Sequence, residues 1–179
     1  MFGTKKKLSK EQASALIFDA VFDRALDIMD NKDKRGLASI DEARILLVFL
    51  SVYMFIFLQA FQFPVDSEEK KKIFCKAEEL VMLMMIQLYG ISMDLANDMV
   101  SHVHSLLLEY NECVKKFEGR GDEVCKWEVA KCAAGDLMEG DEGEGDRYER
   151  FIAYNSICYE EITTYLKADV EKLNEFTLV

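Results

Sequence analysis

The feature that most constrains this chain is a run of 21 residues, Ile45 to Val65, without a charged side chain. At a rise of about 1.5 Å per residue, a helix of this length crosses about 30 Å of hydrocarbon, so a membrane span has to be considered. The run also suits the central helix of a bundle, which is apolar on nearly every side because other helices surround it. Any fold of this chain must bury the segment.

The polar residues in and around this run favour burial in protein. On a helical wheel they fall within roughly 80° of arc; they are Asp41, Arg44, Ser51, Gln59, Gln62 and Asp66. A narrow polar stripe is typical of a core helix with one edge at the surface, although Val48 and Phe55 share this stripe. Lysines flank both ends of the run, so the positive-inside rule gives no orientation. We expect a core helix over about residues 40–63; the alternative is that residues 45–65 are inserted in a membrane.

Apolar residues recur with helical spacing along the rest of the chain, and capping signals mark where helices begin. A serine or aspartate precedes a glutamate or glutamine by three residues, the spacing of a capping box, at Ser9, Ser39, Asp66 and Asp146. Gly90 is predicted to end one helix, and Ser92 or Asp94 to cap the next, which makes the two an antiparallel hairpin.

These signals predict six helices and no strand. The expected ranges are about 9–30, 40–63, 67–89, 93–117, 123–134 and 147–174. The other amphipathic helices need a common apolar partner, and the charge-free helix provides one. We therefore predict an all-α fold, a single irregular bundle of about six helices around the central apolar helix, in one domain over residues 1–179.

The charge balance limits the class of partner. Against 22 lysines and arginines stand 33 aspartates and glutamates, a net charge of −11. Binding to a nucleic-acid backbone needs an excess of cations and is not expected, whereas a protein with a basic surface suits this charge. The five cysteines are an odd set in a chain that does not need disulfides, and no apolar segment follows the basic N-terminal residues directly. We therefore expect reduced thiols and a cytoplasmic location.

No catalytic or cofactor motif is assembled in the sequence. Neither of the glycine-rich phosphate-binding patterns occurs. His102 and His104 lie about 200° apart on their helix, so they do not bind one metal ion together. Cys125 and Cys132 share a helix face but lack a second pair of ligands. We predict a non-enzymatic protein without a cofactor or metal.

Two segments are candidates for binding a partner. Residues 139–146 form an acidic loop without an apolar residue, predicted to be solvated and mobile; its candidate residues are Asp141, Glu142, Glu144 and Asp146. The loop does not match the spacing of an EF-hand. The second segment contains Met82, Met84 and Met85, which form an adaptable binding surface if they are exposed and core filling if they are not.

The predicted function is that of a soluble helical interaction protein of the inhibitor, immunity, adaptor or chaperone type. Its acidic surface is expected to bind a basic protein partner. Two alternatives stay open at this point. One is a membrane-associated helical protein with residues 45–65 inserted, and the other is a bundle that encloses a lipid or haem between the second, third and fourth helices.

Overall fold

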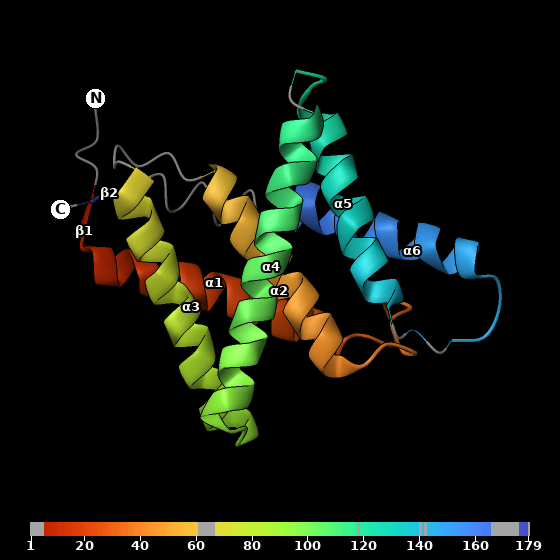
Figure 1. Cartoon of the computed structure of the whole chain (residues 1–179), viewed down its shortest axis with the longest axis horizontal. Coiled ribbons are helices and arrows are strands. Elements are labelled where there is room, and N and C mark those ends of the chain that lie inside the picture. The colour runs from red at the N-terminus through yellow and green to blue at the C-terminus, as the bar shows by residue number, and fades with distance from the viewer. Residues whose placement is uncertain are drawn as a thin grey trace.

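The computed structural model describes residues 6–60, 67–117, 119–139, 141, 143–165 and 176–178. In these residues six α-helices pack against one another (Figure 1). They are α1 (Lys10–Asp30), α2 (Glu42–Ala60), α3 (Ser67–Tyr89), α4 (Met93–Phe117), α5 (Asp122–Met138) and α6 (Arg147–Glu160). A π-helical turn, Glu161–Tyr165, continues α6. The prediction of an all-α bundle of about six helices is confirmed.

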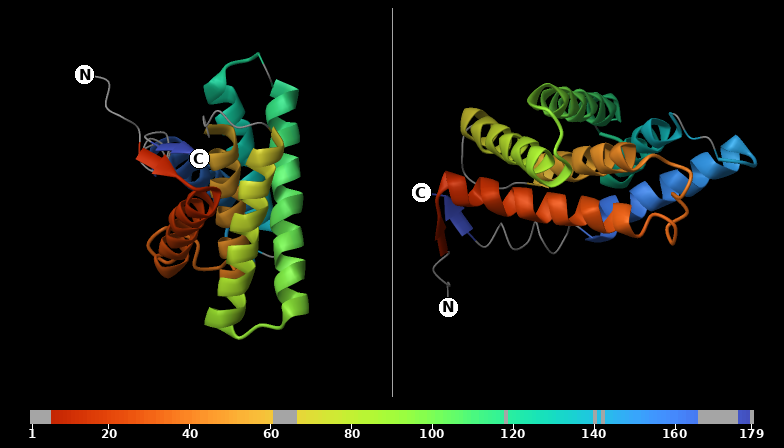
Figure 2. Two further views of the ribbon diagram at one scale, coloured as in Figure 1. Left: turned by 90° about the vertical axis from the view of Figure 1, so that its left-hand side faces the viewer. Right: turned by 90° about the horizontal axis from the view of Figure 1, so that it is seen from below.

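Helix α2 lies at the centre, with α1 on one side and α4 and α5 on the other (Figure 2). Its side chains from Ile45 to Phe55 are buried apart from the half-buried Leu47, and Phe49 and Tyr53 are fully enclosed. The described part of the apolar run, as far as Phe57, therefore forms the core, as predicted. None of the helices in the described ranges is long and apolar enough to cross a membrane.

We predicted that the polar stripe of α2 lies at an edge that reaches water, and for Ser51 this prediction was wrong. Ser51 is fully buried, and its hydroxyl donates a hydrogen bond to the Leu47 carbonyl at 2.7 Å. A serine hydroxyl in a helix can donate its hydrogen bond to the carbonyl four residues earlier, so it does not need contact with solvent. Gln62 and Asp66 lie outside the described residues.

The helix starts follow the capping signals at three places. At the start of α1, Ser9 Oγ accepts from the Gln12 N–H at 3.2 Å, and the Gln12 side chain accepts from the Ser9 N–H at 2.9 Å. Asp146 accepts the Tyr148 N–H at the start of α6. Ser92 accepts the Leu95 N–H near the start of α4, and Gly90, with φ of 62°, ends α3.

The capping box predicted at Ser39 was wrong. The residue that caps α2 is Asp41, whose Oδ1 accepts from the N–H groups of Ala43 and Arg44 at 2.9 and 3.3 Å. The Ser39 hydroxyl instead donates to Asp141 at 2.7 Å, a contact across 102 residues that no local spacing signals. The signal at Asp66 lies outside the described residues.

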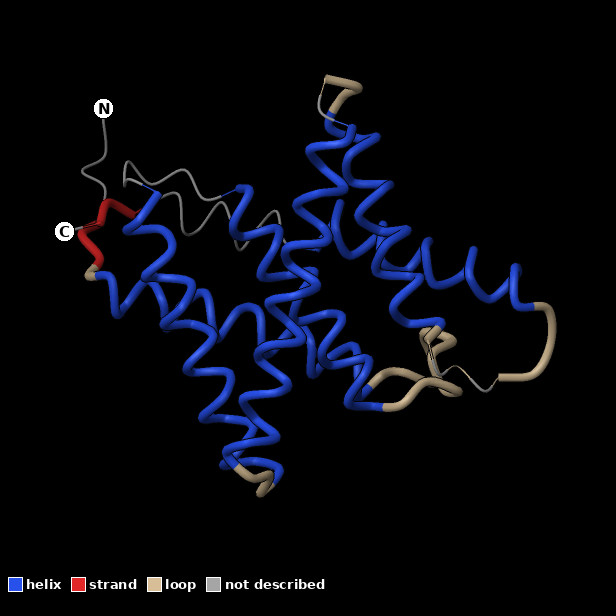
Figure 3. Tube along the Cα trace, in the orientation of Figure 1, coloured by secondary structure: helices blue, strands red, loops and turns tan. Residues whose placement is uncertain are grey.

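Two short strands also depart from the prediction. Strand β1 (Lys6–Leu8) pairs in parallel with β2 (Phe176–Leu178), and Figure 3 shows them together beside the start of α1. Three-residue strands are too short to produce an alternating pattern in the sequence, and their pairing joins distant parts of the chain.

The last two helices have different ends from those predicted. Helix α5 continues to Met138 rather than stopping near residue 134, because Leu137 and Met138 are buried in the core. The α-helical geometry of α6 ends at Glu160, where the π-helical turn begins. The predicted extension over residues 166–174 lies outside the described residues.

Candidate partner-binding site

Asp141, a candidate in the acidic loop, is an internal anchor. Its carboxylate accepts hydrogen bonds from the Ser39 hydroxyl at 2.7 Å, Arg150 Nε at 2.7 Å, Tyr154 Oη at 3.2 Å and the Gly143 N–H at 2.9 Å. The side chain has no exposed area. Burial opposes ionisation, but the hydrogen bonds outweigh it and hold the pKa of this carboxyl below its usual value. The prediction that Asp141 faces solvent in a mobile loop was wrong.

The other acidic loop candidates differ from Asp141. Glu144 and Asp146 are exposed, and Asp146 also caps α6. Glu142 lies outside the described residues. Binding of a partner by Glu144 and Asp146 stays a prediction. Because Asp141 is enclosed, the loop presents less of its negative charge to a partner than its sequence indicates.

The three candidate methionines lie along α3 and are more buried than a binding surface requires. Met85 belongs to the core, whereas Met82 and Met84 are half-buried. Met84 packs directly against the core. These side chains therefore support the inner face of α3.

Four of the apolar side chains that reach solvent lie where α3 turns into α4. Leu88, Tyr89, Met93 and Leu95 are 46 to 55% exposed, and we call these four residues the turn surface. Figures 1 and 2 show that this turn projects beyond the neighbouring ends of α1 and α2. A group of exposed apolar side chains on a projecting turn is a candidate for an interaction site.

The α3–α4 hairpin that carries the turn surface is acidic, although two of its glutamates, Glu79 and Glu112, are paired with Lys76 and Lys115. Residues 77–114, which cover most of the α3–α4 hairpin, contain six aspartates and glutamates and no lysine or arginine. Asp94 and Asp98 are exposed on α4, and no cation of the described part of the chain pairs with them. This charge pattern is readable in the sequence, and together with the exposed turn it makes the hairpin a candidate site that the sequence analysis did not single out.

The far side of the turn surface is also acidic. Partial burial, followed by the negative charges of Asp30 and Glu42, raises the pKa of Tyr89. Lys32 binds Glu42 at 2.9 Å, so the uncompensated charge on this side comes from Asp30. The turn surface is thus apolar at its centre and acidic on two sides.

The histidines lie on the same hairpin and are exposed, rather than half covered at the boundary of the core. His104 Nδ1 is 3.3 Å from Glu78 Oε1, while His102 points elsewhere on the helix. Within the described ranges, no group of three or more histidine, cysteine, aspartate or glutamate side chains is placed to hold a metal ion.

One buried and one half-buried carboxylate inside the bundle, Glu161 and Asp136, were not identified from the sequence. Glu161 is 1% exposed; its Oε1 accepts from Arg35 Nη1 at 2.6 Å and its Oε2 from Tyr53 Oη at 2.7 Å. Asp136 accepts from Tyr110 Oη at 3.1 Å, and burial together with the charge of Glu109 raises its pKa to about 7. Each carboxylate has hydrogen-bond donors from other helices or loops, so both act in packing.

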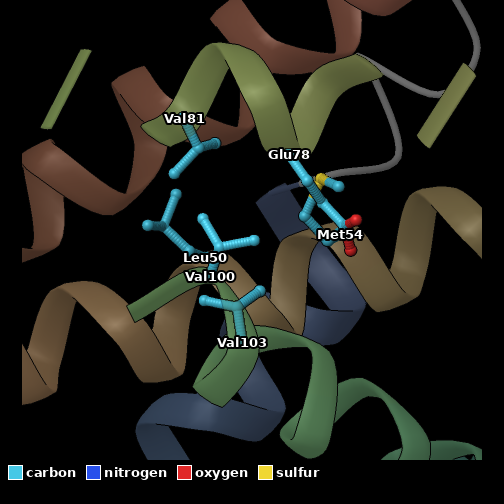
Figure 4. A pocket seen from close by; sticks show the side chains of 6 residues that line it. All are labelled: Leu50, Met54, Glu78, Val81, Val100 and Val103. Carbon is cyan, nitrogen blue, oxygen red and sulfur yellow. The ribbon is translucent and has the colours of Figure 1, made fainter. Parts of the chain in front are cut away.

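A small cavity lies between α2, α3 and α4 (Figure 4). It is lined by Leu50, Met54, Glu78, Val81, Val100 and Val103, and its volume is about 10 Å³. This volume holds about one water molecule. This cavity is too small for a lipid or a haem.

Comparison of the chain with models of protein families, with curated proteins and with solved structures found no match. The class of protein is therefore defined by the fold, an all-α bundle, and the function has to be argued from the hairpin and its charges.

Proposed function

We propose that this chain is a non-enzymatic protein-binding module that recognises a basic protein partner through the acidic α3–α4 hairpin. The proposal rests on one observation: the exposed apolar turn surface lies on a hairpin that contains no lysine or arginine over residues 77–114. Protein interfaces combine an apolar centre with a polar rim, and the rim charges guide the partner's approach.

The cost of this arrangement to the isolated fold supports a binding role. Asp94 and Asp98 are four residues apart on α4, a spacing at which like charges repel each other and destabilise a helix slightly. On α5, by contrast, the acidic residue Glu128 forms an ion pair with a lysine three residues later, Lys131. The charge of Asp98 adds little to the stability of the fold, whereas it would attract a cationic partner.

The test begins with the tagged full-length chain in an extract of its native cells at about 50 mM salt, where charge attraction is weakly screened. Bound proteins are identified, purified and titrated individually against the chain. For the true partner we expect Asp94→Asn combined with Asp98→Asn to weaken binding roughly five- to tenfold, the effect of removing two charges at the rim of an interface.

A matched control is present on α1. Asp19 and Asp23 are also exposed aspartates four residues apart, and in the described residues no cation pairs with them. The double change Asp19→Asn and Asp23→Asn removes the same charge from a different face. Equal weakening by the two double variants would show that only net charge matters and would contradict a site on the hairpin.

A further inference from the structure

The turn surface has a convex shape that restricts what can cover it. Leu88 and Tyr89 end α3, Met93 begins α4, and Gly90 between them adopts a positive φ that allows the chain to reverse sharply. Because the turn projects beyond its neighbours (Figure 2), its side chains are enclosed only by a surface that offers a recess. A flat partner would contact the tip alone and leave most of this apolar area in water.

The charges around the turn indicate which side chains should border that recess on the partner. Asp94 and Asp98 border the turn surface on the α4 side and Asp30 on the α1 side, while Lys32, two residues after Asp30, is already bound to Glu42. A second copy of this chain would bring an identical acidic rim against the first, and like charges across an interface oppose binding. A surface of anionic phospholipids would be repelled in the same way.

We propose that the turn surface inserts into an apolar recess bordered by lysine or arginine side chains on a partner protein, with Tyr89 as the central anchor. This inference rests on the proposed function and adds the point of contact and the chemistry of the partner's surface. Tyrosine is enriched among the residues that dominate binding energy, because a large rigid ring fills a pocket while its hydroxyl keeps a polar partner. Tyr89 is 46% exposed, so it has surface left to bury in a complex.

The experiment places the photo-reactive amino acid p-benzoylphenylalanine at Tyr89 of the full-length chain in its native cells. The matched control carries the same group at Tyr148, an exposed aromatic residue at the start of α6. We expect irradiation to produce one discrete protein adduct from position 89 and not from position 148. The adduct should be lost when Asp94→Asn and Asp98→Asn are added, and the crosslinked peptide should lie in an apolar recess with lysine or arginine at its border.

The purified partner then allows a direct test of the anchor. Tyr89→Ala should weaken binding at least about 30-fold, as expected for the dominant residue of an interface, and Tyr148→Ala should leave it within about twofold. Circular dichroism and thermal unfolding of both variants confirm that the fold is retained, since both side chains are largely exposed.

Other results would overturn the docking site. A lipid adduct would assign the turn to a membrane surface, and an adduct of twice the chain's mass would assign it to a second copy. An adduct from position 148 alone, with binding still weakened by the hairpin changes at Asp94 and Asp98, would contradict the docking site while leaving the proposed function intact. Binding that depends on neither position nor on the hairpin charges would contradict both.

Discussion

Glu161 and Asp141 lie among hydrogen-bond donors that enclose their carboxylates, whereas Asp94 and Asp98 face water on a hairpin without lysine or arginine between residues 77 and 114. A buried carboxylate is retained only when donors compensate for its lost hydration, so the first two residues are committed to the fold. The exposed pair has no such partner among the described residues, and its charge is available to another molecule. Negative charge in this chain therefore divides into a structural set and an exposed set, to which we assign binding as a proposal.

The largest effect should come from removing the most enclosed carboxylate. Glu161→Ala leaves Tyr53 without the Glu161 carboxylate as its acceptor and removes the 2.6 Å ion pair of Arg35, so the free energy of unfolding should fall by about 3 kcal/mol. Urea denaturation measures this change. Glu160→Ala, the exposed neighbour, is the control and should lie within about 0.5 kcal/mol of the unchanged chain. A loss below about 1 kcal/mol for Glu161→Ala would place Glu161 outside the structural set.

Asp141 should show the next largest effect. Asp141→Ala removes the acceptor for Ser39, Arg150 and Tyr154, and we expect a loss of about 2 kcal/mol, typical of hydrogen bonds to a charged group. Glu144→Ala, in the same acidic loop but exposed, should change stability little.

The lowered pKa of Asp141 also predicts a pH dependence. Its contribution to stability is complete above the unfolded pKa, ordinarily 3.8, and is lost as the pH falls through the lower folded value. The difference in stability between the unchanged chain and Asp141→Ala should therefore shrink in acid. A difference independent of pH in this range would show that the carboxylate acts through packing alone.

Asp136 should respond to pH with the opposite sign. Its pKa is raised from 3.8 to about 7, so the folded chain binds a proton more tightly than the unfolded chain does. This contribution is complete below pH 3.8 and is lost as the pH rises toward 7. In Asp136→Asn this decrease in stability with rising pH should disappear. Thermal unfolding of both chains at a series of pH values measures the difference. An identical pH profile for the two chains would show that Asp136 titrates normally.

The smallest effect on stability is expected on the hairpin. Asp98→Asn removes an exposed charge without a described partner, so the free energy of unfolding should change by no more than about 0.5 kcal/mol. Chemical denaturation compares this variant with Asp141→Ala under the same conditions. A loss as large as that of Asp141→Ala would remove the distinction between structural and binding charges.

The parts of the fold that were predictable from sequence depend on nearby residues. The apolar run that became α2, the caps at Ser9 and Asp146, and the turn at Gly90 are all signalled within a few positions of each other. Long-range contacts were not predictable. The Ser39–Asp141 hydrogen bond and the β1–β2 pairing each join segments more than 100 residues apart. Because of the first contact, Asp141 is enclosed by other side chains and does not face solvent, as its sequence had predicted it would.

The candidate site was predictable only in part. An acidic surface for a basic partner followed from the net charge, but the position of that surface did not. The absence of lysine and arginine from residues 77–114 is visible in the sequence. By contrast, the exposure of Leu88 and Tyr89 depends on how far the α3–α4 turn projects past α1 and α2, which is set by helix packing.

The measurement that tests the central claim most directly is the affinity for the purified partner across a range of salt concentrations. It compares the unchanged chain, the hairpin variant (Asp94→Asn with Asp98→Asn) and the α1 variant (Asp19→Asn with Asp23→Asn). Salt screens exposed charges, so the hairpin variant should bind more weakly at about 50 mM salt and converge with the unchanged chain at about 0.5 M, while the α1 variant follows the unchanged chain throughout. Three superimposed curves, or equal effects of the two variants, would contradict the assignment of the hairpin charges to binding.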